Sequence, residues 1–415
     1  MLQGEVIMKL VYQKPSSELL DGFLIALLVT FGVCYAQGLF VMVFVLAFRL
    51  LLAAKTNYGI SVPLSGLWLI MLMILIDIEG MRIGDSEQFS IPYNSAVFLC
   101  AIMVQLILMH YQGDIIKVIK AGTIFASLMA GMSILSSEYS MLMYRWGDFI
   151  AGHSGYRLGI SSDINPNVIA WSFGFLTLLA IFMFICDKSL LLLAVCIFDL
   201  LIVFFTGSKN GLILALLPVL YYGIKMVKKV NIKALVLIAI GIVFFWIAIH
   251  QSPVLYTLVG KRIDSALFTI GFNDGAGLSG DVVDVSSTEK RLDMIGVARK
   301  MFLEKPVLGW GIGAFAVYSG FGYYCHNNYM EILVSGGIVL FLIYYIPILL
   351  VGSKIFTMKK GKEKDLALIL LLTIFIMDFS TVNFYSNWIF FLRTVILCEV
   401  VMWNQKGKVI THEEI

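Results

Sequence analysis

Residues 165–205 read NPNVIAWSFGFLTLLAIFMFICDKSLLLLAVCIFDLLIVFF, two apolar runs divided by Asp187 and Lys188. A helix needs about 20 apolar residues to cross a hydrocarbon core of about 30 Å, and each run comes close to that length. Most of the 415 residues follow the same pattern, because 60% are hydrophobic, 14% are charged and the mean hydropathy is +0.92. Soluble domains carry about 25% charged residues. The composition therefore excludes a water-soluble enzyme and indicates a membrane protein.

The apolar runs are continuous rather than alternating, which excludes an outer-membrane barrel. Lipid cannot satisfy exposed backbone groups, so continuous apolar runs must be helices. We predict an all-α, polytopic fold with about twelve transmembrane helices and short amphipathic helices in one large outer loop. The predicted spans are 21–36, 38–54, 62–77, 94–110, 118–136, 165–186, 189–205, 209–224, 232–250, 327–351, 365–383 and 385–403. The first two are divided only by a turn near Gln37 and Gly38.

Lysine and arginine gather in the cytoplasmic loops of membrane proteins. A cytoplasmic N-terminus places eighteen such residues inside and only four in the short outer loops. The inner ones are Lys9, Lys14, Arg49, Lys55, Lys117, Lys120, Lys188, Lys225, Lys228, Lys229, Lys233, Lys354, Lys359, Lys360, Lys362, Lys364, Lys406 and Lys408, and the outer ones are Arg82, Arg145, Arg157 and Lys209. The net charge of +3 thus reflects membrane borders rather than a nucleic-acid site. Both termini are expected in the cytoplasm.

This topology divides the chain into three regions. Residues 1–250 hold about nine spans, residues 251–326 form a large extracytoplasmic loop, and residues 327–415 hold three spans and a short cytoplasmic tail. Loop 137–164 is the second-largest polar stretch and faces the same side. We therefore expect recognition or chemistry outside the cytoplasm.

The large loop contains one predicted amphipathic helix. Ser286 and Glu289 have the spacing of a capping box, apolar residues recur at helical spacing after them, and Pro306 ends the run. The recurring apolar residues are Leu292, Ile295, Ala298 and Phe302. Such a helix lies on or near the membrane surface. We interpret Arg299 and Lys300 as cations that extend toward lipid headgroups, and we keep Arg291 as a candidate site residue.

Two short motifs follow this helix. Gly309, Gly311 and Gly313 stand at alternate positions between Pro306 and Phe315, where the missing side chains let the backbone approach a ligand or another chain. His326 then comes at the outer mouth of the tenth span, with Asn327 or Asn328 suited to cap that helix. Taken alone, a histidine at a membrane border more often packs there than catalyses.

The order of these elements resembles the O-antigen ligase and O-antigen polymerase family. The resemblance rests on Arg291 in a surface helix, the stretch Pro306 to Phe315, the motif His326, Asn327 and Tyr329, and the span that opens with Gly336, Gly337 and Ile338. It implies a membrane glycosyltransferase that moves a glycan from undecaprenyl pyrophosphate onto an acceptor sugar with inversion at the anomeric carbon. Supporting site residues would be Asn327, Tyr329 and the three glycines, with no cofactor.

A further match lies at residues 206–211, at the outer mouth of the eighth span. The family has an arginine where this chain has Lys209. Lysine supplies charge without a bidentate fork. The resemblance makes Lys209 and Arg291 the candidates to bind the pyrophosphate, while charge placement alone would also explain Lys209 as a residue that marks a helix end.

The resemblance also assigns the remaining chemistry. A departing pyrophosphate needs positive charge where negative charge develops, which suits Arg291 and Lys209. The acceptor hydroxyl must lose a proton, and an imidazole of ordinary pKa suits His326 as that base. The rival bases are Asp148, Asp163, Glu138 and Asp264.

Other charges are interpreted structurally. Asp281 and Asp284 are expected in a solvated turn, so no metal site is predicted. Asp378 and Arg393 are expected to pair inside the membrane, as are Asp199 and Lys209.

The favoured function is polymerisation of lipid-linked repeat units of a capsule, exopolysaccharide or O-antigen. The expected partners are the lipid-linked donor and acceptor, membrane lipid, and a flippase and a chain-length regulator. One alternative is a ligase that acts on a lipid core or a protein. The other is a secondary transporter or flippase, which the small number of charges within the spans disfavours.

Overall fold

The computed structural model is all-helical over the residues that it describes, which are 17–54, 62–83, 89–109, 115–145, 157–227 and 282–413, with Tyr111, Gly147 and scattered residues between 240 and 264. Its helices are α1 (Glu18–Cys34), α2 (Gly38–Ala54), α3 (Leu64–Met81), α4 (Ile91–Leu108), α5 (Ile115–Tyr144), α7 (Pro166–Asp187), α8 (Leu190–Thr206), α9 (Lys209–Val227), α13 (Val282–Glu304), α14 (Ala314–Tyr318), α15 (Asn328–Thr357), α16 (Lys362–Met377) and α17 (Trp388–Glu413).

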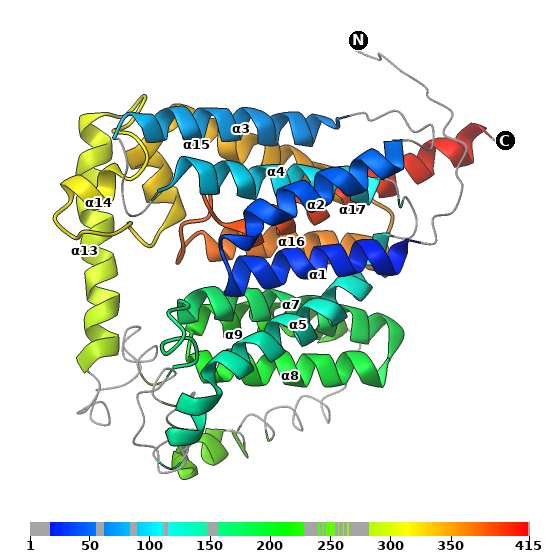
Figure 1. Ribbon diagram of the computed structural model, residues 1–415, viewed down its shortest axis with the longest axis horizontal. Coiled ribbons are helices and arrows are strands. Elements are labelled where there is room, and N and C mark those ends of the chain that lie inside the picture. Colours follow the sequence, from blue (N-terminus) through cyan, green and yellow to red (C-terminus); the bar gives the residue numbers. More distant parts are fainter. Residues whose placement is uncertain are drawn as a thin grey trace.

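The long helices lie side by side in one bundle, and α13 runs across one end of it (Figure 1). Within the bundle α1 packs on α5, α7 packs on α8 and α9, and α17 packs on α4 and α16. We call the end crossed by α13 the α13 end. Five helices of the described part are long and apolar enough to cross a membrane, namely α3, α4, α5, α7 and α15. The chain is therefore a helical membrane protein.

Helix boundaries agree with the sequence at several points. The turn predicted near Gln37 and Gly38 is confirmed, because α1 ends at Cys34 and α2 begins at Gly38. The helix predicted to end before Pro306 is confirmed as α13, which ends at Glu304. Most of the predicted span 232–250 lies outside the described residues.

Two boundary predictions are wrong. Helix α13 begins at Val282, so Ser286 and Asp284 lie within it instead of in a cap and a turn. Favourable backbone hydrogen bonding extends the helix by a turn past the expected cap, which overrides the local preference of serine for a terminus. Helix α5 continues to Tyr144, into the segment that we expected to be loop.

The glycine-rich motifs are explained by a break in α15. Gly337 has φ 61° and ψ −160°, which interrupts the helix. The backbone groups left without helical partners pair with residues 306–311: Trp310 N donates to Val334 O at 2.7 Å, Gly311 N to Ser335 O at 2.8 Å, and Ile338 N to Pro306 O at 2.8 Å. The segment thus satisfies the broken helix, as buried backbone groups require.

Two of the three predicted supporting glycines, Gly309 and Gly311, serve this contact, and Gly313 directly precedes α14. All have positive φ, and a Cβ at Gly309 would lie 2.5 Å from the Ser335 backbone. A Cβ at Gly311 would lie 3.2 Å from Glu79 O, at the end of α3. Gly309 and Gly311 therefore let this segment approach α15 and α3 of the same chain.

Replacing Gly337 with alanine is expected to destabilise the protein by about 1–3 kcal/mol, the usual cost of a strained backbone. The added Cβ would also lie 2.2 Å from Val307 O. Thermal unfolding in detergent measures the loss. The matched control is Gly296→Ala in α13, where a Cβ meets nothing within 4 Å and alanine favours the helix by up to about 1 kcal/mol. Equal melting temperatures for the two variants would contradict the packing role of Gly337.

Candidate functional site

Segments that the sequence analysis assigned to the outer side are joined at the α13 end. The Arg82 guanidinium, just after α3, donates to the carbonyls of Leu308 at 2.9 Å and Gly309 at 3.1 Å. Arg157 Nε donates to Thr206 O at 2.7 Å, which ties the segment before α7 to the end of α8. Asn328 N donates to Asp378 O at 2.8 Å. These contacts gather several distant segments at one end of the bundle.

Arg291 and His326 lie close enough to interact. The His326 ring packs on Tyr324, with ring centroids 4.5 Å apart, and its backbone is held at φ 55°. Burial, and then the positive charge of Arg291, lower the pKa of His326 to about 4. The same arginine opposes the increase that burial causes in the pKa of Tyr324. Helix α13 thus places a cation beside the histidine.

This environment changes the expected chemistry of His326. An ordinary imidazole pKa was expected from the sequence, whereas burial and Arg291 lower it in the folded protein. A lowered pKa means that the ring loses its proton at a lower pH, so the imidazole is neutral at pH 7 but is a weaker base than an ordinary histidine.

The pH dependence of kcat/KM tests this state, because that parameter reports the free enzyme. We expect a protonation limb for His326 near pH 4 and a nearly flat profile from pH 5.5 to 7.5, with activity restored after return from acid. A limb at the ordinary imidazole pKa, about 6.5, would contradict the buried, Arg291-coupled environment.

Glu331 is a residue of this region to which sequence reasoning assigned no role. Its side chain is fully buried in the first turns of α15, and Oε2 accepts a hydrogen bond from Cys325 N at 2.7 Å. Cys325 directly precedes His326, so this bond fixes the backbone that positions the histidine. A carboxylate within an apolar span was the available signal, because such groups are usually paired or functional.

The two asparagines at the start of α15 have separate roles. Asn327 caps the helix by accepting a hydrogen bond from Met330 N at 3.0 Å, which settles which of the two candidates forms the cap. Asn328 is buried, and its Oδ1 accepts hydrogen bonds from Asn383 N at 2.6 Å and Phe384 N at 3.1 Å. It thereby holds the turn between α16 and α17.

Tyr329, a predicted supporting residue, packs away from His326. Its hydroxyl donates to Phe375 O at 3.0 Å, and its ring stacks on Tyr345 with centroids 5.3 Å apart. The tyrosine therefore joins α15 to α16.

Lys209 begins α9, beside the turn that Arg157 contacts. Burial and Arg291 are the causes of the lowered pKa of His326, and Lys209 is not one of them. The predicted pairing of Lys209 with Asp199 is wrong. Asp199 accepts a hydrogen bond from Ser127 at 2.8 Å, and its Oδ1 has no hydrogen-bond partner in the described part of the chain.

The predicted Asp378–Arg393 pair is confirmed only in part: the two charges interact electrostatically, but hydrogen bonds to Asp378 come from other residues. Asp378 accepts hydrogen bonds from Tyr345 at 2.7 Å and Asn383 at 2.6 Å. Arg393 Nε and Nη1 have no hydrogen-bond partner among the described residues. Neutral donors from α15 and from the α16–α17 turn bind the carboxylate, and a linear sequence does not reveal their proximity.

The four carboxylates that we considered as alternative bases lie in different parts of the chain. Glu138 is buried and accepts hydrogen bonds from Ser162, one of them from Ser162 N at 2.8 Å. Asp264 is buried and accepts a bond from Tyr256 at 3.0 Å. Asp148 lies outside the described residues. Asp163 is the rival that lines the cavity described next.

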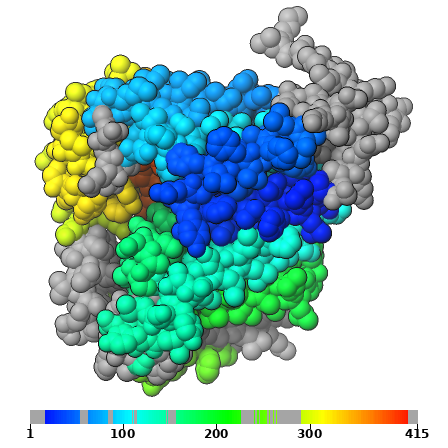
Figure 2. Space-filling model, in the orientation of Figure 1, coloured from blue at the N-terminus to red at the C-terminus, as the bar shows by residue number. Residues whose placement is uncertain are grey.

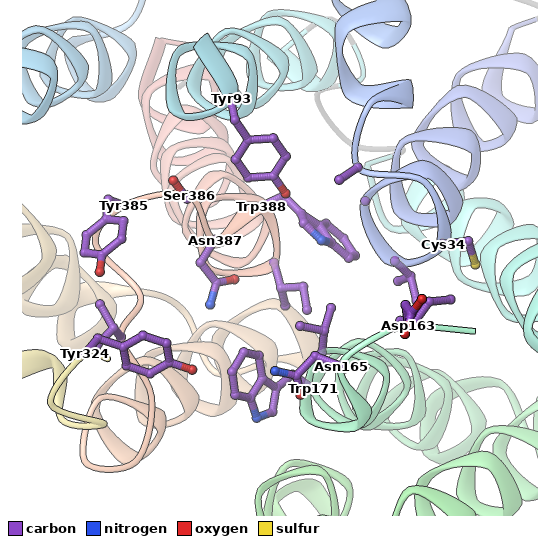
Figure 3. Close-up of a pocket in the computed structure, with 17 residues that line it drawn as sticks. Cys34, Tyr93, Asp163, Asn165, Trp171, Tyr324, Tyr385, Ser386, Asn387 and Trp388 are labelled. Atoms are coloured by element: carbon purple, nitrogen blue, oxygen red, sulfur yellow. The ribbon is translucent and has the colours of Figure 1, made fainter. Parts of the chain in front are cut away.

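A cavity of about 370 Å³ opens beside Tyr324. It is bounded by the end of α1, the start of α4, the start of α7 and the α16–α17 turn, and aromatic and amide side chains surround it (Figure 3). Its aromatic lining residues are Tyr93, Trp171, Tyr324, Tyr385 and Trp388, and its polar ones include Asp163, Asn165, Ser386 and Asn387. Figure 2 shows a hollow at this end, with atoms of the α16–α17 region at its floor. Tyr324 joins the cavity to the Arg291–His326 pair.

This cavity could not be predicted from the sequence because its walls come from five separate segments. Trp171 and Trp388 read as ordinary members of apolar spans, and no spacing links them. Only helix packing brings them together. No group of histidine, cysteine and acidic side chains suited to a metal ion occurs among the residues that the structure describes.

Comparison with known proteins bears on the region that holds these motifs. Residues 190–345 match the family model described as O-Antigen ligase. The matched region contains Lys209, Arg291, the glycine segment and His326. No curated protein and no solved structure matches the chain. The resemblance inferred from the motifs is thereby confirmed for residues 190–345, the part of this membrane protein that matches the O-Antigen ligase family model.

Proposed function

We propose that this chain polymerises lipid-linked oligosaccharide repeat units at the outer face of a bacterial plasma membrane. In this proposal the growing glycan moves from undecaprenyl pyrophosphate to the acceptor sugar of another lipid-linked unit, without a metal. The observation that carries the proposal is the electrostatic action of Arg291 on His326, whose ring packs on Tyr324, a wall of the aromatic cavity. The family match supports a glycosyltransferase of O-antigen processing.

The proposed reaction is a single displacement. An acceptor hydroxyl attacks the anomeric carbon of the donor, the bond to pyrophosphate breaks, and the configuration inverts. His326 accepts the hydroxyl proton, and Arg291 stabilises the negative charge that develops on the departing pyrophosphate. The pyrophosphate leaves on its lipid carrier.

The topology inferred from charge completes the proposal. We propose about twelve spans, cytoplasmic termini and an extracytoplasmic α13 end. Ion pairs between residues assigned to the inner side support a common location, since Lys120 contacts Asp187 at 2.7 Å and Lys225 contacts Asp365 at 2.6 Å. The hollow of Figure 2 is visible from the side of the bundle, where a lipid-linked substrate could enter from the bilayer.

Purified protein in liposomes tests this function. We expect lipid-linked repeat units to be lengthened without a flippase or a chain-length regulator, although both would be partners in the cell. Translocation of the glycan with no new bond would support the transporter alternative instead. Transfer to a lipid core or a protein, but not to a second repeat unit, would support the ligase that the family description names.

Lys209 is proposed as a second cation for the pyrophosphate once the lipid-linked donor is bound. We expect Lys209→Ala to lower transfer activity, and Lys209→Arg to retain it, because arginine keeps the charge and adds a bidentate fork. Steady-state transfer rates in liposomes measure the difference. Equal rates for the alanine variant and the wild type would mean that Lys209 marks the end of a helix and does not bind the pyrophosphate.

A further inference from the structure

We propose that the aromatic cavity at the α13 end binds an uncharged sugar ring of the acceptor and that the pyrophosphate binds outside it, beside Arg291. The inference rests on the proposed function and divides its site into two parts. We call the cavity lined by Tyr93, Trp171, Tyr324, Tyr385 and Trp388 the aromatic pocket.

The walls of the aromatic pocket suit the apolar faces of a sugar. Pyranose rings present patches of C–H bonds that pack on aromatic faces, and aromatic side chains supply large, rigid contact surfaces. Figure 3 shows the rings of Tyr93, Trp171, Tyr324 and Trp388 around a common space. The rings come from α4, α7, the segment before α15 and α17, so the fold itself builds the platform.

Polar groups of the aromatic pocket suit sugar hydroxyls. Asn165 and Asn387 contribute amides, Ser386 a hydroxyl and Asp163 a carboxylate. The wall that bears two of them is fixed: Ser386 N donates to Asn94 Oδ1 at 3.0 Å, and Asn387 Nδ2 donates to Asn383 Oδ1 at 2.8 Å. Amides and hydroxyls both donate and accept hydrogen bonds, as sugar hydroxyls do.

A buried polar atom in the same wall lacks a partner. The Tyr385 side chain is 6% exposed, and its hydroxyl makes no hydrogen bond among the described residues. Buried polar groups are almost always hydrogen-bonded. A bound hydroxyl would supply the missing partner, and Figure 3 shows the Tyr385 hydroxyl on the side of Tyr324.

Charge separates the aromatic pocket from a pyrophosphate site. No lysine, arginine or histidine occurs among its described lining residues, and Asp163 adds a negative charge. A pyrophosphate needs charge-assisted donors, which the aromatic pocket does not offer. Arg291 does not line the aromatic pocket, and it acts electrostatically on both Tyr324 and His326.

The position of His326 identifies the sugar as that of the acceptor. The base must reach the hydroxyl that attacks, and His326 packs directly on Tyr324, a wall of the aromatic pocket. A volume of about 370 Å³ lies at the lower end of small-molecule sites, about 300–1,000 Å³. It suits one sugar unit better than a long glycan.

Two probes separate the two halves of the site in nanodisc-embedded protein. One is the free repeat-unit oligosaccharide released from its carrier, and the other is undecaprenyl pyrophosphate alone. We expect Trp171→Ala to weaken oligosaccharide binding at least tenfold and to change carrier binding less than twofold, with Trp171→Phe close to the wild type. Arg291→Ala should show the opposite pattern. Trp246→Ala, at an exposed tryptophan outside the aromatic pocket, is the matched control.

Trp171→Ala with unchanged oligosaccharide affinity, or with equal losses for both probes, would overturn the proposal. If that variant does not fold, thiol labelling of the wild type decides. Cys34 lines the aromatic pocket and Cys186 is exposed and does not line it. The oligosaccharide should slow labelling of Cys34 alone, and equal rates with and without it would overturn the proposal.

The proposed polymerase function and the proposed sugar site can be tested independently of each other. Oligosaccharide binding that depends on Trp171, without glycan lengthening in liposomes, would remove the polymerase and keep the sugar site. If the protein lengthens glycans but its Trp171→Ala variant binds the oligosaccharide normally, the sugar site would be rejected and the polymerase function would be kept.

Discussion

Replacing His326 with alanine is expected to lower the rate of glycan transfer by about 10²–10⁴, the usual contribution of a positioned general base. The imidazole is neutral at pH 7 because burial and Arg291 lower its pKa to about 4, so it accepts the acceptor proton without first losing one. Alanine leaves water as the acceptor of that proton. Initial rates with lipid-linked repeat units in liposomes measure the loss.

The control for this variant is His250→Ala. His250 contacts Asp264 at 3.4 Å and does not line the aromatic pocket, so its loss should leave the transfer rate within about twofold. Membrane insertion and melting temperature should match the wild type in both variants. Full-length polymer from His326→Ala protein would remove the histidine from the mechanism and leave Asp163, the carboxylate in the aromatic pocket, as the leading base.

The low pKa of His326 connects the base to substrate binding. Arg291 is one of the two causes of the lowered value. A pyrophosphate bound beside Arg291 would offset its positive charge and let the pKa of His326 rise. The base would then become stronger when the donor is in place. Burial, the larger cause, would still keep the ring neutral at physiological pH.

The sequence predicted the helical class well because that class follows from composition and run length. Apolar runs such as 165–186 and 189–205 became α7 and α8 with boundaries within a residue or two. The order of Arg291, the glycine segment and His326 also predicted the family, since those residues lie in one continuous stretch.

The cavity and the break in α15 could not be predicted in the same way. Gly337 breaks its helix because residues 306–311 supply replacement hydrogen bonds, and that pairing joins segments about thirty positions apart. The role of the glycines was therefore visible only after folding. Trp171 and Trp388 likewise carry no local signal, because each satisfies the ordinary pattern of an apolar span.

The partners of the buried charged groups also could not be predicted from the sequence. Glu331, Asn328 and the neutral donors around Asp378 decide which charges meet, and each acts across a tertiary contact. The expected ion pairs Asp378–Arg393 and Asp199–Lys209 relied on proximity in the chain or across one turn. In the fold, Ser127 donates to Asp199 and Asn383 donates to Asp378, while Arg393 acts on Asp378 without a hydrogen bond.

Replacing Arg291 with alanine is expected to lower transfer by about 10²–10³, the typical cost of removing one charge-assisted donor from a transition state. The loss should appear mainly in kcat, because negative charge on the pyrophosphate increases as the glycosidic bond breaks. Arg291→Lys should recover part of the rate, since it restores charge without the bidentate geometry. Single-turnover rates in liposomes separate this step from substrate binding.

The matched control is Arg299→Ala, on the same helix and exposed. Both arginines lie on α13, so helix propensity and net charge change equally in the two variants, and only the place of the charge differs. A general attraction of α13 for anionic lipid carriers would make the two variants equally slow. Selective loss at Arg291 requires the cation beside Tyr324 and His326, because Arg299 lies two turns further along the helix. Equal rates for the two alanine variants would therefore reject a positioned cation, even if both were slower than the wild type.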